Sequence, residues 1–292
     1  MTRVLRLPVV LAFSTAMGAA ALPGAKGGFI ITSDGVRIHY LEAGKGPPIV
    51  FVPGWTMPAE IWEPQIARFS NNYRVVAVDP RSQGESDRPT EGHYPERRAQ
   101  DIKELAEQLR LAPVVLVGWS MGVSEVLAYV EQFGTSTLRA VVLVDGMFSP
   151  PGPQFVATMG RVLRQMQANR AAWTDQFVRS MYRRPQPEDY LRKIIAASLK
   201  TPTNTAVTLS ANMTAGDWTA VLSRLDKPVL YVYASPMLKP QAALVKEQIP
   251  GATVEAFEDA GHALFVDEAE RFNAVLEKFL KSLGFMTGSG DP

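Results

Sequence analysis

One serine of the chain lies in a setting that could make it a nucleophile. Ser120 is the centre of Gly118-Trp-Ser-Met-Gly122, which has the form G-x-S-x-G. An apolar run precedes this motif and a helical pattern follows it, so a sharp strand-to-helix turn would lift the hydroxyl above a sheet. A serine hydroxyl is a poor nucleophile unless a base takes its proton. The plainer alternative is a Gly-Ser turn between a strand and a helix.

A base and an oxyanion donor are the next groups that such chemistry needs. The chain has three histidines. His39 falls within a strand pattern and His93 within a polar loop, so we expect both to be structural or solvated. His262 follows the last strand pattern and is the candidate base. Met121 begins the helix after the serine, where its backbone N–H could stabilise a developing oxyanion.

Strand and helix patterns alternate along most of the chain, which predicts an α/β fold. The apolar patterns indicate a mostly parallel sheet with helices on both faces. The expected strands cover 29–32, 36–41, 48–53, 73–79, 112–118, 138–145, 225–234 and 252–257, and the expected helices cover 58–69, 96–109, 240–248 and 267–283.

Residues 148–224 break this alternation after the sixth strand pattern. Four helical patterns, over 154–169, 172–182, 188–198 and 205–213, replace the strands. We interpret this insertion as a helical cap over the site. The cap is rich in methionine, which adapts to irregular pockets or simply packs between helices. We expect Trp119, Met147 and Met181 to contact the substrate.

The two ends of the chain differ from its middle. A short basic segment is followed by a mostly apolar run that ends in Ala19-Ala-Ala21, a pattern typical of a secretory signal peptide. We therefore expect residues 1–25 to direct export and to leave no stable membrane insertion after cleavage, although an uncleaved anchor is the alternative. Residues 286–292 have the composition of a disordered tail. The core is expected to comprise 26–147 and 225–285.

Composition narrows the classes of partner. The formal net charge is +1 and no basic run contains interleaved aromatic residues, so nucleic acid is not an expected partner. The chain has no cysteine, which excludes disulfides and a thiol nucleophile. With only three histidines as well, we expect no metal site and no cofactor.

Four stretches of the chain together resemble the α/β-hydrolase superfamily, and in particular its capped serine esterase and perhydrolase-like branch. The resemblance covers about Phe29 to Leu283. The stretches are Phe51-Val-Pro-Gly-Trp55, residues 78–89, Gly118-Trp-Ser-Met-Gly122 and Asp259-Ala-Gly-His-Ala263. The resemblance implies the α/β-hydrolase fold, with Ser120 as nucleophile and His262 as base. Within residues 78–89 it implies a loop that braces the site without catalysing.

The resemblance leaves the acid of a catalytic triad open. Members usually carry it after the strand that precedes the histidine strand, but residues 234–240 contain no Asp or Glu. A second known position follows the preceding strand, where Asp145 stands, and this keeps the order Ser, Asp, His. Glu258 and Asp259 are too close in sequence to His262 to be preferred. Ser235 or a water could also serve in place of a carboxylate.

The resemblance also implies the second oxyanion donor. Members carry it on the residue after a His-Gly pair, which here is Pro53-Gly54. The backbone N–H groups of Trp55 and Met121 are therefore the expected oxyanion hole, because the proline changes a side chain and not the donor.

These residues predict a serine hydrolase that cleaves carboxylic esters of small to medium acyl groups through an acyl-enzyme intermediate. The expected partner is a small-molecule ester. Perhydrolase, thioesterase, lactonase and carbon–carbon hydrolase activities are alternatives that use the same triad. A non-catalytic ligand-binding member of the fold is the competing class.

Overall fold

A computed structural model of the protein describes residues 24–150 and 152–284 and contains one eight-stranded sheet. The strand order is β1-β2-β4-β3-β5-β6-β7-β8. The pairs from β3 to β8 are all parallel, whereas β1 and β2 pair antiparallel at one edge. The bounds are β1 Lys26–Ile31, β2 Arg37–Ala43, β3 Pro48–Val52, β4 Arg74–Val78, β5 Val114–Trp119, β6 Leu138–Val144, β7 Val229–Tyr233 and β8 Thr253–Ala256.

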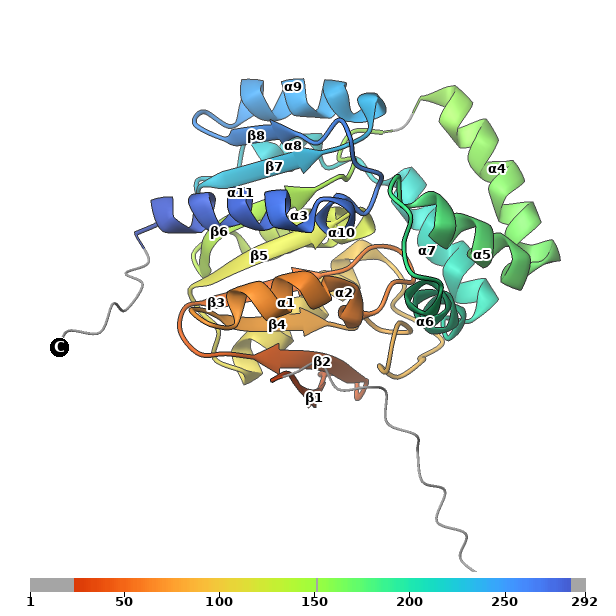
Figure 1. The fold of residues 1–292 in the computed structure, drawn as a ribbon, viewed down its shortest axis with the longest axis horizontal. Helices are drawn as coiled ribbons and strands as arrows, with labels where there is room; N and C mark the ends of the chain where they lie inside the picture. Colours follow the sequence, from red (N-terminus) through yellow and green to blue (C-terminus); the bar gives the residue numbers. More distant parts are fainter. Residues whose placement is uncertain (1–23, 151, 285–292) are drawn as a thin grey trace, which may run out of the picture.

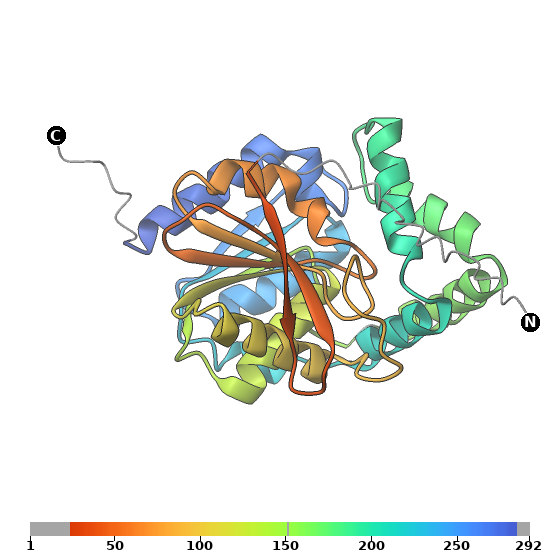
Figure 2. The same cartoon turned by 90° about the horizontal axis from the view of Figure 1, so that it is seen from below.

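Helices cover both faces of the sheet, as the sequence predicts (Figure 2). The central strands are apolar at almost every position, because alternate side chains enter two separate cores. Ile49 and Phe51 of β3 pack in one core, and Val50 and Val52 pack in the other. The first core is closed by α1 Glu63–Phe69 and α11 Ala269–Ser282, and the second by α2 Pro95–Gln108, α3 Met121–Phe133, α8 Thr219–Leu222 and α9 Lys239–Gln248.

Helices α4 to α7 lie between β6 and β7 in sequence and gather beyond one end of the parallel strands (Figure 1). Their bounds are α4 Pro153–Ala168, α5 Arg170–Ser180, α6 Glu188–Leu199 and α7 Thr203–Ala215. They agree closely with the four helical patterns in the sequence. The range 148–224 also includes α8, which packs against α3 in the core rather than with the other four. We call α4 to α7 the cap.

Three short helices complete the described chain. They are η1 Ala59–Trp62, η2 Pro236–Leu238 and α10 Leu264–Asp267. They follow β3, β7 and β8, respectively, so they lie close to the end of the sheet that the cap covers. Within 24–150 and 152–284, no helix is both long and apolar enough to cross a membrane. The expected signal peptide and tail lie almost entirely outside the described residues.

Candidate active site

Ser120 occupies a strained turn between β5 and α3. Its φ and ψ are 56° and −117°, a region that a non-glycine residue adopts only when its surroundings impose it, at a cost of about 1–3 kcal/mol. Two glycines permit the turn. A Cβ on Gly118 would lie 2.4 Å from the Gly122 carbonyl oxygen, and one on Gly122 would lie 2.6 Å from the Val52 carbonyl oxygen. The G-x-S-x-G spacing is therefore required by close backbone packing.

The His262 ring lies between a hydroxyl and a carboxylate. Its Nε2 is 2.8 Å from the Ser120 Oγ, and its Nδ1 is 2.6 Å from the Asp145 Oδ2. A carboxylate can only accept, so Nδ1 carries the proton and Nε2 is free to accept from the serine. The Trp119 indole N–H donates to the His262 carbonyl at 2.9 Å and its ring lies beside the imidazole. The sequence-predicted nucleophile, base and acid candidates are thus in contact.

Asp145 reaches the histidine from the end of β6. Its second oxygen, Oδ1, accepts the backbone N–H groups of Ala234 at 2.7 Å and Ser235 at 3.4 Å. These residues follow β7, where related chains usually carry the acid. Here the same position instead supplies amide donors that orient the carboxylate of the neighbouring strand. The structure brings Asp145, rather than Glu258 or Asp259, to the His262 ring.

The loop after β3 lies directly against the nucleophile. A Cβ on Gly54 would be only 3.0 Å from the Ser120 Cβ, so the backbone that leads into Trp55 passes beside the serine. Met121 is the first residue of α3, and the N–H groups of a first helical turn have no intrahelical partner. The two predicted oxyanion donors therefore flank Ser120. Their role in catalysis remains a prediction.

We call residues 54–57 the oxyanion loop. One buried side chain, that of Gln83, attaches this loop to the core. The Gln83 side-chain N–H₂ donates to the carbonyls of Gly54 at 3.1 Å and Met57 at 2.7 Å. Its Oε1 accepts from Arg98 at 2.7 Å, and Arg98 pairs with Glu125 of α3 at 3.0 Å. Sequence reasoning missed Gln83, although its position in a polar loop after β4 is a weak signal.

The cap holds the same loop from the other side. The Trp55 indole N–H donates to the Ala206 carbonyl of α7 at 2.8 Å. The Thr56 hydroxyl lies 2.7 Å from that of Ser198, at the end of α6. Thr56 has a φ of 56°, so the hydrogen bonds from the core and the cap hold a strained backbone in place.

A cavity of about 400 Å³ opens beside Ser120 and His262. Its wall is mostly apolar and aromatic, and the ionisable side chains among the described wall residues are Asp145 and His262. Most of the other wall residues come from the cap and from the segments after β6 and β7. They include Met147, Phe155, Met159, Val162, Trp173, Phe177, Met213, Trp218, Met237 and Leu238, and Trp55 joins them from the oxyanion loop.

Of the three predicted substrate contacts, the structure places only Met147 in the cavity wall. The prediction is wrong for Trp119 and Met181, which are 1% exposed and pack in the core. Trp119 ends β5, and its ring packs against Trp62 and Phe265 in the core. Met181 directly follows α5, and its carbonyl accepts the Ala263 N–H. It thus joins the cap to the residue after His262.

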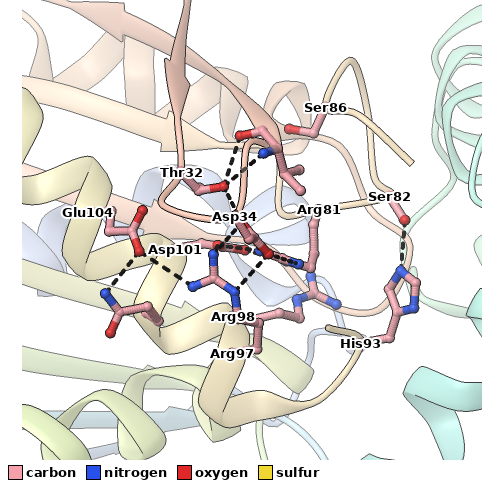
Figure 3. A network of polar contacts seen from close by, with 12 residues as sticks. Thr32, Asp34, Arg81, Ser82, Ser86, His93, Arg97, Arg98, Asp101 and Glu104 are labelled. Atoms are coloured by element: carbon pink, nitrogen blue, oxygen red, sulfur yellow. Dashed lines mark hydrogen bonds and ion pairs between the residues drawn. The ribbon is translucent and has the colours of Figure 1, made fainter. Parts of the chain in front are cut away.

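The loop after β4 is braced by a cluster of buried charges (Figure 3). Arg81 is 1% exposed and makes two hydrogen bonds of 2.7 Å to Asp101 of α2, together with a longer contact to Asp34. His93 is buried in the same region, with its Nε2 2.9 Å from the Ser82 hydroxyl. Burial, with the nearby Arg98 and Arg81 charges, lowers the pKa of His93 to about 4. These groups support the site without touching the cavity.

The comparisons with known proteins agree with this fold. Residues 49–275 match the sequence profile described as the Alpha/beta hydrolase family. The chain belongs to the α/β-hydrolase family. An esterase from Exiguobacterium antarcticum superimposes with a TM-score of 0.82 at 25% identity, covering 88% of this chain and 100% of the esterase. In the described residues no three His, Cys, Asp or Glu side chains gather as a metal site.

Two sequence relatives are named as chloroperoxidases rather than as esterases. The chain is 27% identical to a putative non-heme chloroperoxidase from Synechocystis over 84% of its own length and 95% of that protein. It is 39% identical to a non-heme chloroperoxidase from Streptomyces lividans, but over only 42% of this chain and 45% of that protein. This α/β hydrolase therefore resembles both esterases and non-heme haloperoxidases.

Proposed function

We propose that this α/β hydrolase cleaves carboxylic esters of small to medium acyl groups. The observation that carries the proposal is the chain of contacts from Ser120 through His262 to Asp145, beside a largely apolar cavity of about 400 Å³. Such a cavity suits a neutral acyl group. A carboxylate-bearing acyl group would lack a cationic partner, because no Lys or Arg lines the described wall.

The proposed mechanism has two stages. In the first, the Ser120 Oγ attacks the ester carbonyl while the His262 Nε2 takes the hydroxyl proton, and the N–H groups of Trp55 and Met121 stabilise the oxyanion. Collapse of this intermediate breaks the bond to the alcohol, which leaves with the proton from His262. Asp145 orients the ring and stabilises the imidazolium.

In the second stage, water attacks the acyl-enzyme carbonyl while His262 takes one of its protons. Collapse of the second tetrahedral intermediate releases the carboxylic acid and returns the proton to Ser120. The enzyme is unchanged, and one ester and one water give one acid and one alcohol. The apolar wall excludes other water and so strengthens the electrostatic interactions around the oxyanion.

The test is hydrolysis of p-nitrophenyl acetate and butyrate, together with labelling by a fluorophosphonate probe. Wild type should turn over both esters and take the label on Ser120. We expect Ser120→Ala to lower kcat at least ten-thousandfold and to abolish labelling, because the nucleophile acts as a unit with its base. Turnover or labelling that survives in the alanine variant contradicts the proposal. Absence of turnover in wild type favours a non-catalytic binding protein.

The chloroperoxidase relatives favour one further candidate, which is acyl transfer to hydrogen peroxide. Peroxide would then replace water in the second stage, attack the acyl-enzyme carbonyl and leave as a peracid while Ser120 regains its proton. The measurement is peracid formation from a simple ester or acid in the presence of peroxide. Wild type that forms acid but no peracid excludes this candidate.

We also propose that residues 1–25 direct export of the hydrolase. The support is the basic start, the apolar run and the small residues that follow. Fractionation of cells that produce the full chain, with mass measurement of the exported form, tests this. Full-length protein that remains entirely in the cytoplasm contradicts it.

A further inference from the structure

Five serines line the apolar cavity, and they differ in what their hydroxyls bond. Ser120 contacts His262, Ser149 accepts from Gln241 at 2.5 Å, and Ser235 accepts the Met237 N–H at 3.3 Å. The remaining two make no hydroxyl hydrogen bond within the described part of the chain. They are Ser124 and Ser210, which are 3% and 5% exposed.

Ser124 and Ser210 both lie on helices, where a backbone carbonyl of the same helix is a possible hydrogen-bond acceptor. A serine or threonine on a helix can donate to the carbonyl four residues earlier. Thr174, Thr208 and Thr214 of the cap all do so, at 2.7 to 2.9 Å. Ser124 and Ser210 do not. Both hydroxyls border the cavity, so a ligand that displaces water from them must offer hydrogen-bond partners, because a hydroxyl left unpaired in the filled cavity costs about 1–3 kcal/mol.

The two hydroxyls lie on different sides of the cavity. Ser124 belongs to the first turn of α3, four residues after the nucleophile. Ser210 belongs to α7 and enters from the cap. The wall between them carries no charged side chain apart from the Ser120 partners. The acyl chain of a substrate bound at Ser120 would therefore extend from the oxyanion site, through apolar surroundings, to two neutral hydrogen-bond donors.

We propose that the preferred acyl group carries a neutral oxygen acceptor, such as a ketone, several carbons along the acyl chain from the scissile carbonyl. Ser124 donates to this oxygen from the core, and Ser210 donates to the same oxygen or to its neighbour from the cap. This inference rests on the proposed ester hydrolysis and names the substrate class of that site. A polar site discriminates strongly against a substrate that leaves its hydroxyls unpaired, whereas an apolar wall discriminates weakly.

The first experiment compares two esters of matched shape, p-nitrophenyl 5-oxohexanoate and p-nitrophenyl 5-methylhexanoate. Wild type should prefer the oxo ester by about tenfold or more in kcat/KM. Ser124→Ala should bring this preference close to one, and Ser210→Ala should reduce it in the same direction. Ser149→Ala is the matched control, because its hydroxyl lines the same cavity but is held by the N–H₂ group of Gln241, and it should keep the wild-type preference.

A binding experiment separates this inference from the proposed function. The Ser120→Ala variant is titrated with 5-oxohexanamide and 5-methylhexanamide, and the fluorescence of the tryptophans in the cavity wall reports binding. The oxo amide should bind about tenfold more tightly, and adding Ser124→Ala should remove the difference. Equal affinity for the two amides, or an unchanged preference in the Ser124→Ala background, overturns the inference whether or not any ester is hydrolysed.

Discussion

Two histidine–carboxylate pairs lie at the ends of strands β6 and β4, and the pair at β6 lines the cavity beside Ser120. His262 Nδ1 is 2.6 Å from Asp145, and His39 Nδ1 is 2.7 Å from Asp79. Both carboxylates directly follow a parallel strand, β6 or β4. The pairing itself is therefore almost the same in the two regions.

The difference lies at the other ring nitrogen. His262 Nε2 meets the Ser120 hydroxyl, whereas His39 Nε2 faces the backbone of β1, where a Cβ on Gly27 would be 2.9 Å away. The Phe29 ring packs against the same imidazole. A histidine held by a carboxylate becomes a candidate base only when a hydroxyl and a cavity meet its second nitrogen.

Asp79 shows what the second pair does instead. Its oxygens accept the backbone N–H groups of Ala59 at 2.6 Å and Glu85 at 3.0 Å, in addition to the His39 ring. It thus ties together the start of η1, the loop after β4 and strand β2. The same chemistry that orients a base in one region stabilises loops in the other.

Removal of each imidazole ring in turn should have the largest effect. We expect His262→Gln to lower kcat by about ten-thousandfold or more with little change in Tm, because the base is lost and the fold is not. His39→Gln should lower Tm and leave most of the ester hydrolysis. Esterase assays and thermal unfolding of both variants test this. Similar losses of kcat in the two would refute the division of roles.

The carboxylates give the next largest effect. Asp145→Asn should lower kcat about a thousandfold to ten-thousandfold, since an amide no longer fixes the Nδ1–H tautomer. Asp79→Asn should instead cost about 2–4 kcal/mol of unfolding free energy, because a buried charged acceptor of three donors is lost. Urea unfolding and kcat are measured for both. An Asp145→Asn variant with wild-type turnover would show that the acid lies elsewhere.

His93 completes the set, since it has a serine partner, Ser82, but no carboxylate. Its pKa is about 4 in the folded protein and near 6.5 when unfolded, so the unfolded chain binds more protons between these values. Stability from this residue is present above pH 6.5 and is lost as pH falls towards 4. From pH 7 to 5 this residue alone lowers the free energy of unfolding by about 2 kcal/mol. The total fall in unfolding free energy over this range should therefore be smaller in His93→Gln than in wild type. Equal losses in both proteins would contradict this.

The smallest predicted effect concerns the oxyanion loop. Gln83→Leu should lower kcat about tenfold and change KM less, because Gln83 positions the loop and the oxyanion forms only during reaction. Gln83→Glu is the matched variant, since it can still accept from Arg98 but cannot donate to the Gly54 and Met57 carbonyls. It should lose kcat like the leucine variant. Wild-type turnover in Gln83→Glu would assign the effect to Arg98 alone.

Local patterns were enough to predict most of the fold. The apolar run before Ser120, the glycines around it and the alternation of strands and helices all act within a few residues, so the sequence carries them directly. The cap helices were predicted for the same reason. Strand order could not be read from these patterns, because it depends on crossovers between segments far apart in the chain.

The site was predictable where it follows strand ends and not where it depends on distant contacts. Ser120 and Asp145 both sit where parallel strands finish, and His262 follows the last strand. The bonds of Trp55 to Ala206 and of Gln83 to the oxyanion loop join segments many residues apart, and no local pattern marks them. Trp119 packs against Trp62 and Phe265, which lie far from it in the chain, so no local pattern marks it as a core residue.

The attachment of the oxyanion loop to both halves of the molecule has a consequence for how such a chain can change. Trp55 and Thr56 are held by α7 and α6, which belong to the part that also shapes the cavity. Exchange of the whole cap for that of a relative would bring a new selectivity and, at the same time, remove two anchors of the loop beside Ser120. A new substrate preference should therefore evolve more easily by substitution of wall residues on α4, such as Phe155 and Met159, than by changes in α6 and α7.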